Sequence, residues 1–154
     1  MKPQPGTYAL ILFSSTSTTL EIGKLGTMQV CRGYYVYVGS AFGPGGLAAR
    51  IAHHARIAPH PHWHIDYLKQ FIQLQSVWLT YDRIRREHQW AGLLAAMRGA
   101  AIPVTKFGAS DCKCTSHLVY FQKLPSRDAF RRKAHSFIKD HDKILTHLFP
   151  NKKF

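Results

Sequence analysis

The chain has 154 residues, enough for one domain with a hydrophobic core. Its 21 lysines and arginines outnumber its 8 aspartates and glutamates, and the net charge of +13 favours polyanionic partners, nucleic acid first. No apolar run approaches the ~20 residues that span a bilayer, and apolar residues begin only after a proline–glycine break, so we expect a cytoplasmic protein without a membrane partner. Three cysteines, an odd number, suit a reducing compartment better than a disulfide framework.

Aromatic and β-branched residues predict strands in the N-terminal part of the chain. These strands are expected at residues 6–13, 20–22, 27–31 and 33–40. Short turns join them, which predicts an antiparallel meander. Side chains alternate along the last strand, so Tyr35 and Tyr37 share one face of it. Tyr8 would lie near Tyr37 if the strand at residues 6–13 and the strand at residues 33–40 are neighbours.

After residue 43, helical periodicity and extended patterns alternate. Helices are predicted at residues 44–57, 63–71 and 84–98, strands at 74–81 and 117–124, and a C-terminal helical stretch at 128–149 with Ser126 or Asp128 as its cap. In the first of these helices Arg50 and His54 lie four residues apart, so their side chains point the same way.

Glu87 is an anomaly in the predicted helix at residues 84–98. Projected at about 100° per residue, it falls inside an apolar arc that contains Ile84, Trp90 and Leu94. A carboxylate aimed inward is costly unless it is paired, protonated or bound to a cation. A salt bridge with an arginine and a bound cation are both open explanations.

These residues occur in a recognisable order. Gly6-Thr7-Tyr8 and Tyr37-Val38-Gly39 resemble the paired motifs of the GIY-YIG nuclease superfamily. A Gly-Ser turn then leads to a helix with Arg50 and His54, and a later helix carries Glu87, as in that superfamily. The stretch between Tyr8 and Tyr37 is longer than usual, which predicts an extra excursion between the two motif strands.

Two further segments resemble an uncharacterised branch of the same superfamily. They are residues 61–68 and residues 107–118, and the second contains the pattern Ser-Asp-Cys-x-Cys-x-Ser-His-Leu. The resemblance covers roughly residues 5 to 122. It implies an α+β fold with a small three-stranded antiparallel sheet flanked by helices in residues 1–122. Residues 123–154 would then form a basic helical extension packed on the same domain.

The resemblance also implies an activity, metal-dependent endonucleolytic cleavage of DNA that selects DNA structures in repair or recombination. Glu87 would hold Mg²⁺ or Mn²⁺, since a single carboxylate leaves the cation free to keep water and phosphate oxygens. Arg50 would clamp the phosphate with its planar fork. One of Tyr8 and Tyr37 would relay the proton of the attacking water, and His54 would orient a tyrosine or the phosphate.

Substrate contacts are expected from Gly39 and Ser40 in the turn and from His64. The asparagine that often follows the glutamate helix in the nucleases has no clear counterpart here. A non-catalytic nucleic-acid-binding module or repair accessory protein is therefore the alternative function.

His62, His64 and Asp66 have the spacing of a possible metal site. His62 and Asp66 share a face if the segment is helical, and all three alternate if it is extended. Histidines close to proline are also common in surface loops, so both interpretations stay open.

Cys112, Cys114 and His117 raise the possibility of structural zinc. Zinc takes four ligands, usually from pairs spaced by two to four residues, so Cys-x-Cys is tight and a fourth ligand, for example Cys31 or His62, would be needed. The interpretation we favour from sequence is that these are reduced, buried small residues.

On that interpretation, Ser110, Asp111 and His117 hold the loop against the active face.

The C-terminal segment is basic, with nine lysines and arginines against three acidic residues from residue 123 onward. Arg131, Arg132 and Lys133 are expected to contact a phosphate backbone without reading bases. A solvated helix face is the alternative explanation of these charges.

Overall fold

The computed structural model describes residues 1–110 and 112–150, which form an α+β fold. The strands are β1 (Gly6–Ser14), β2 (Thr18–Glu21), β3 (Thr27–Val30), β4 (Gly33–Ala41), β5 (Gln73–Thr80), β6 (Leu118–Phe121) and β7 (Leu145–Leu148). The helices are α1 (Gly46–His54), α2 (His64–Leu68), α3 (Glu87–Ala95) and α4 (Arg127–Phe137), with a short 3₁₀ turn at Gly23–Leu25. None of the described helices combines the length and the apolar character needed to cross a membrane.

The main sheet has five antiparallel strands in the order β6-β4-β1-β5-β7, so the predicted three-stranded sheet is too small. β1 and β4 are paired along their whole length, which confirms that the two motif strands are neighbours. They take the centre because most residues of both strands are buried, with buried side chains on both faces. β6 and β7 extend the sheet beyond β4 and β5.

The predicted meander is wrong, because β2 and β3 pair only with each other. Their burial alternates, with one apolar face toward the main sheet and one polar face outward. A strand pair with a single apolar face packs on a sheet and does not join its centre. This hairpin is the excursion predicted between the two motif strands.

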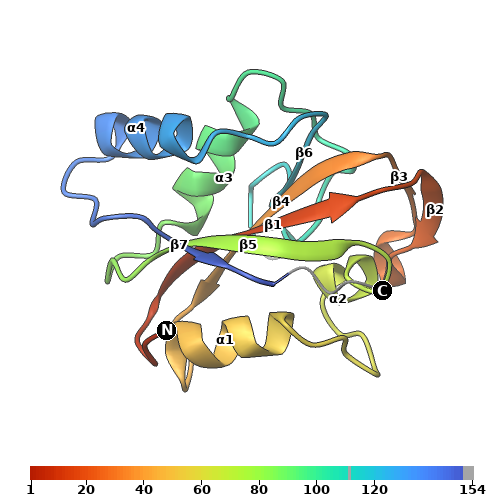
Figure 1. Ribbon diagram of the computed structural model, residues 1–154, viewed down its shortest axis with the longest axis horizontal. Coiled ribbons are helices and arrows are strands. Elements are labelled where there is room, and N and C mark those ends of the chain that lie inside the picture. Colours follow the sequence, from red (N-terminus) through yellow and green to blue (C-terminus); the bar gives the residue numbers. More distant parts are fainter. Residues whose placement is uncertain (111, 151–154) are drawn as a thin grey trace.

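The two faces of the sheet carry separate hydrophobic clusters. Figure 1 shows α1 and α2 on one side of the sheet and α3 and α4 on the other. α1, α2 and the β2–β3 hairpin cover the face that carries Tyr8 and Tyr35. α3 and α4 cover the opposite face, which carries Val36 and Val38. Tyr37 packs against the first cluster together with Tyr35, which confirms the predicted alternation along this strand.

The C-terminal segment is only partly helical, so the predicted helix at residues 128–149 is wrong beyond Phe137. Ser126 caps α4 as predicted, with its Oγ accepting the N–H of Ala129 at 3.1 Å. After α4 the chain returns to the sheet, and β7 pairs with β5. Pairing supplies hydrogen-bond partners to an edge of β5 that would otherwise stay open. Residues 151–154 of the predicted extension lie outside the described residues.

α3 begins at Glu87, three residues later than predicted. Asp82 and Arg86 form a buried ion pair with 3.0 Å between Nε and Oδ2, and Asp82 also accepts the N–H of Ile84 at 2.9 Å. These bonds hold residues 82–86 in a turn, which leaves Ile84 59% exposed instead of buried in the predicted apolar arc. Trp90 and Leu94 are buried as predicted.

Phe130 fastens α4 to the sheet, so its truncation tests this docking. Its ring is fully buried and lies 5.3 Å from the Trp78 ring and 5.0 Å from the Trp90 ring, centroid to centroid. Phe130→Ala should lower the free energy of unfolding by about 3–5 kcal/mol, because it removes a buried aromatic ring and leaves a cavity. Urea unfolding measures this. Phe137→Ala, in the same helix but 74% exposed, is the matched control and should change stability by less than about 0.5 kcal/mol.

Candidate active site

Tyr8 and Tyr37 meet on one face of the sheet because β1 and β4 are paired in register. Tyr8 lies opposite Gly39, and Leu10 lies opposite Tyr37. A Cβ atom on Gly39 would come within 2.3 Å of the Tyr8 hydroxyl, so only glycine leaves room for the Tyr8 ring. Gly39 was predicted as a substrate contact; the structure places it beneath Tyr8.

His54 forms a buried pair with Tyr8. The Tyr8 hydroxyl and His54 Nε2 lie 2.8 Å apart, and each residue is at most 2% exposed. Burial, with help from the charges of Lys69 and other neighbours, lowers the pKa of His54 to about 3, so the ring is neutral at pH 7. A neutral imidazole has one donor and one acceptor nitrogen. Nδ1 of His54 has no hydrogen-bond partner among the described residues.

Both tyrosines are held in the protonated form. Burial raises the pKa of Tyr8 well above its usual value, and the neighbouring Tyr37 raises it further. Burial likewise raises the pKa of Tyr37, with the charge of Glu87 as the second cause. The charge of Arg50 acts in the opposite direction on both but is outweighed.

Arg50 extends from α1 toward the two tyrosines. Its guanidinium lies over the ring of Trp63, 4.6 Å from the centroid, in a cation–π contact. Trp63 is 36% exposed and also touches the rings of His53 and His54. No sequence pattern singled out Trp63, because its partner Arg50 lies 13 residues earlier in the chain.

Glu87 lies at the first position of α3 and is half-buried. The prediction that its carboxylate points into the core is therefore wrong. Gly39 and Ser40 lie in β4 and not in the predicted turn, because both pair with β1. The Ser40 hydroxyl donates a hydrogen bond to Glu87 Oε2 at 3.0 Å, so the predicted substrate contact and the predicted metal ligand are in contact. Glu87 is close enough to raise the pKa of Tyr8 and Tyr37. Five predicted catalytic residues from four separate elements thus lie in one neighbourhood.

Of the two interpretations left open for His62, His64 and Asp66, the structure does not favour a shared metal site, because these three side chains do not form a ligand group. His64 Nδ1 accepts the N–H of Gly108 at 2.9 Å, and burial lowers the pKa of this ring. Asp66 accepts the backbone N–H groups of His62 and Trp63, at 3.1 and 3.0 Å, so it fixes the start of α2.

Asp66 instead faces His53, with 3.2 Å between Oδ1 and Nε2. Burial alone would raise the pKa of this carboxyl, but the bonds from Trp63, His62 and His53 outweigh burial and lower it. His53, His54 and Asp66 form a group with ligand atoms within 4.8 Å of one another. The hydrogen bonds of the Asp66 carboxylate already satisfy its oxygen atoms, so this carboxylate does not need a bound cation.

Lys69 is a buried residue that the sequence analysis missed. Its amine donates to the carbonyls of His54 at 2.7 Å, Arg56 at 2.9 Å and His53 at 3.4 Å, at the end of α1. Burial lowers its pKa to about 8. A lysine at a helix C-terminus satisfies carbonyls that lack intrahelical partners and complements the helix dipole. Lys69 therefore holds the helix that carries Arg50 and His54.

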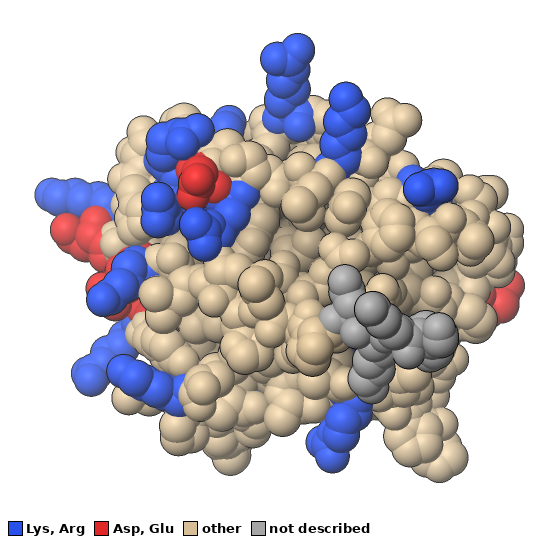
Figure 2. Space-filling view, in the orientation of Figure 1, with Lys and Arg blue, Asp and Glu red and all other residues tan. Residues whose placement is uncertain are grey.

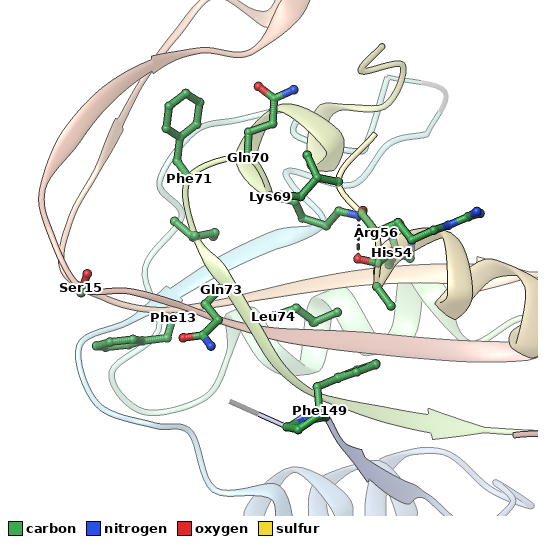
Figure 3. Close-up of a pocket in the computed structure, with 14 residues that line it drawn as sticks. Phe13, Ser15, His54, Arg56, Lys69, Gln70, Phe71, Gln73, Leu74 and Phe149 are labelled. Carbon is green, nitrogen blue, oxygen red and sulfur yellow. Dashed lines mark hydrogen bonds between the residues drawn. The ribbon is translucent and has the colours of Figure 1, made fainter. Parts of the chain in front are cut away.

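A pocket of about 550 Å³ lies behind this helix end (Figure 3). Its apolar lining includes Phe13, Leu74 and Phe149, and Figure 3 shows the Lys69 amine directed at the His54 carbonyl. His54 is the one predicted catalytic residue among its lining residues. The pocket is therefore separate from the face where Arg50 and Glu87 lie.

The C-terminal cations lie on the other side of the sheet. Arg131, Arg132 and Lys133 belong to α4, which packs on the face opposite Tyr8 and Tyr37. Figure 2 shows a group of lysine and arginine side chains around an acidic one where α4 lies in Figure 1. Arg131 pairs with Asp128 at 3.6 Å, an exposed pair of small energetic weight. The structure does not bring these cations together with the tyrosines.

The segment from Lys106 to His117 folds back toward α3. The N–H of His117 donates to the Phe107 carbonyl at 2.8 Å, and its own carbonyl accepts from Val38 of β4 at 2.9 Å. His117 therefore holds the loop against the sheet, whereas Ser110 is exposed and Asp111 lies outside the described residues. Cys112, Cys114 and His117 gather with His88, which the sequence analysis did not select.

Comparison with known proteins identifies one related family. A family model described as "Domain of unknown function DUF123" matches residues 7–139, which include every predicted catalytic residue. Searches of curated proteins and of solved structures return no match to this chain.

The neutral, buried state of His54 predicts a pH dependence of stability. The unfolded chain takes up a proton on this ring near pH 6.5 but the folded chain does so only near pH 3, so stability falls as the pH drops between these values. One such group contributes about 1.4 kcal/mol per pH unit. In urea unfolding at several pH values, His54→Gln should show a slope smaller by up to this amount.

His60→Gln, at an exposed loop position, is the control and should keep the wild-type slope. His64, His117 and His141 also have lowered pKa values and remain in both variants, so the comparison isolates His54. Equal slopes for His54→Gln and wild type would contradict a neutral buried ring.

Proposed function

We propose a function from the site itself, because the chain belongs to the DUF123 family, whose description assigns no activity. We infer that the protein is a metal-dependent DNA endonuclease that hydrolyses phosphodiester bonds. The observation that carries this proposal is the convergence of Tyr8, Tyr37, Arg50 and Glu87 in a chain of net charge +13. The resemblance to the GIY-YIG nuclease superfamily supports it, since that resemblance implies the same residues on two adjacent strands and two helices.

Glu87 is the residue best suited to hold a divalent cation. It is half-buried, and its neighbour Ser40 adds a hydroxyl oxygen, so the donors are the oxygen atoms that Mg²⁺ and Mn²⁺ prefer. A cation bound there would offset charge on the phosphate and favour ionisation of a bound water. The single carboxylate would leave most cation positions to water and phosphate oxygens.

Arg50 is placed to bind the phosphate. Stacking on Trp63 restrains its guanidinium while its N–H groups stay available for phosphate oxygens. Trp63 also presents an aromatic surface on which a nucleobase can stack. Together they would position the scissile phosphate beside Glu87.

The tyrosines and His54 are uncharged in the free protein. In the free protein both hydroxyls are protonated, so a tyrosine relays a proton only when further positive charge lowers its pKa. His54 is a poor base because its pKa is about 3, so it acts as a positioning residue that fixes the Tyr8 hydroxyl. Tyr37, the less buried of the two tyrosines, is the one we propose to contact substrate.

A non-catalytic nucleic-acid-binding protein is the second candidate function. One observation favours it: Tyr8 is 1% exposed and already hydrogen-bonded to His54, so it contributes to packing. This candidate keeps Arg50 and the net charge as binding elements and needs no cation at Glu87.

Replacing Glu87 separates the two candidates. Glu87→Gln should lower cleavage of branched, flapped or linear DNA by at least about 100-fold, the usual cost of removing one electrostatic stabiliser of a transition state. DNA affinity should change by less than about twofold. The assay is a Mg²⁺ and Mn²⁺ titration with each substrate, and DNA binding is measured in parallel.

Glu21→Gln is the matched control, since Glu21 is an exposed carboxylate on β2 that accepts a bond from Thr27. It should cleave like wild type. If wild type cuts none of the substrates above the level of Glu87→Gln, the endonuclease proposal is wrong and the binding function stands.

The cations on α4 give a separate electrostatic prediction. If Arg131, Arg132 and Lys133 contact phosphates, the triple alanine variant should bind DNA more weakly, with a salt dependence flatter by about one slope unit per lost contact. A second variant removes the same charge elsewhere: Lys24, Arg32 and Arg56, all exposed and outside α4, are changed to alanine. DNA affinity is measured against salt for both. An unchanged slope in the α4 variant would show that these residues form a solvated helix face and do not contact phosphates.

A further inference from the structure

Four potential metal ligands surround one point between α3 and the loop before β6. His88, Cys112, Cys114 and His117 each offer one ligand atom, and these atoms all lie within 4.8 Å of one another. His88 Nδ1 is 3.0 Å from Cys114 Sγ, and Cys112 Sγ is 3.5 Å from His117 Nε2. The ligand that the sequence pattern lacked is therefore supplied by a helix 24 residues upstream of Cys112.

The spacing agrees with tetrahedral coordination. Zinc–sulfur bonds of about 2.3 Å and zinc–nitrogen bonds of about 2.0 Å place the donors of a tetrahedral site roughly 3.3–3.8 Å apart. The distances of 3.0 and 3.5 Å lie at or near this range, and every other pair of these atoms lies within 4.8 Å, so small side-chain movements are enough for all four atoms to reach one ion. Two thiolates with two imidazoles suit zinc, whereas carboxylate and carbonyl oxygens suit magnesium.

The backbone holds the ligands from two sides. His117 is buried and is tied to Phe107 and to Val38 of β4 through its backbone groups. A second hydrogen bond closes the loop, from the N–H of Lys106 to the Thr115 carbonyl at 2.6 Å. Cys112 and Cys114 are enclosed by both of these hydrogen bonds along the chain and are half-buried. His88 is exposed, on the first turn of α3.

We propose that His88, Cys112, Cys114 and His117 bind a structural zinc ion that fastens the loop at residues 106–117 to the start of α3. All four positions come from the protein, so the ion keeps no open position for substrate. This inference stands without the proposed function. It does bear on the candidate active site, because His88 follows Glu87 directly.

The same loop also supports the tyrosine face. Phe107 packs edge-on against Tyr37, with 6.0 Å between ring centroids, and the Gly108 N–H is bonded to His64. A Cβ atom on Gly108 would come within 2.9 Å of the Tyr37 ring, so the loop lies directly against this residue. Zinc would therefore fix the position of Tyr37 relative to Glu87.

Metal analysis of the purified full-length chain tests the proposal. After dialysis against metal-free buffer with a thiol reductant, wild type should retain about one zinc per chain. Titration of the zinc-free protein with Co²⁺ should give the visible absorption of tetrahedral cobalt and the near-ultraviolet band of cobalt–thiolate bonds. Cys112→Ser and Cys114→Ser should lose both signals, and Cys31→Ser, the exposed third cysteine, should keep them.

His88→Ala is the sharper variant, because an exposed side chain can be removed without disturbing the core. It should lower zinc affinity by at least about tenfold, since even indirect partners of a metal ligand cost that much. Glu87→Gln should keep wild-type zinc content, whether or not DNA is cleaved. Absence of both zinc and the tetrahedral cobalt spectrum in wild type would overturn the proposal. So would equal zinc loss in Cys31→Ser and Cys112→Ser.

Discussion

The pairing of β1 with β4 is the constraint on which the candidate active site depends. Both strands are buried on both faces, so a shift of one residue would exchange two hydrophobic clusters at once. The register sets Tyr8 over Gly39 and leaves Tyr37 on the same face. α1 then packs on that face and brings His54 to the Tyr8 hydroxyl. A side chain at residue 39 would disturb every one of these contacts.

Burial divides the site into uncharged side chains on the sheet and partly exposed side chains at its edge. Tyr8 and His54 are buried and Tyr37 is half-buried, all in their uncharged forms, because removal from water disfavours ionisation. Arg50 and Glu87 stay partly exposed, where they can meet a phosphate or a cation. Buried charges elsewhere are paired or bonded, as Asp82 with Arg86 shows. The proposed chemistry therefore belongs to Arg50 and Glu87, and the uncharged side chains fix the geometry of the site.

Two kinds of metal chemistry are proposed for consecutive residues, and ligand type keeps them apart. Glu87 and Ser40 offer oxygen donors, which suit a hard cation that exchanges its water. His88 joins two cysteines and His117, which suit zinc held by the protein alone. Successive residues of a helix point about 100° apart, so the two side chains reach different neighbours. A structural ion one residue away would restrain the first turn of α3 and with it the Glu87 carboxylate.

The sequence by itself determined the features that depend on local periodicity. The two central strands, the shared face of Tyr35 and Tyr37, the i,i+4 relation of Arg50 and His54 and the cap at Ser126 follow from spacing along one element. The tertiary structure decided the rest. The start of α3 depends on the hydrogen bond from the Arg86 N–H to the Thr7 hydroxyl, 79 residues away, and β7 forms because the edge of β5 needs hydrogen-bond partners. His88 joins the cysteines, Ser40 meets Glu87, and Lys69 caps α1 across separations of 13 to 47 residues. Such contacts leave no periodic trace in the chain, because they exist only after the sheet has brought distant segments together.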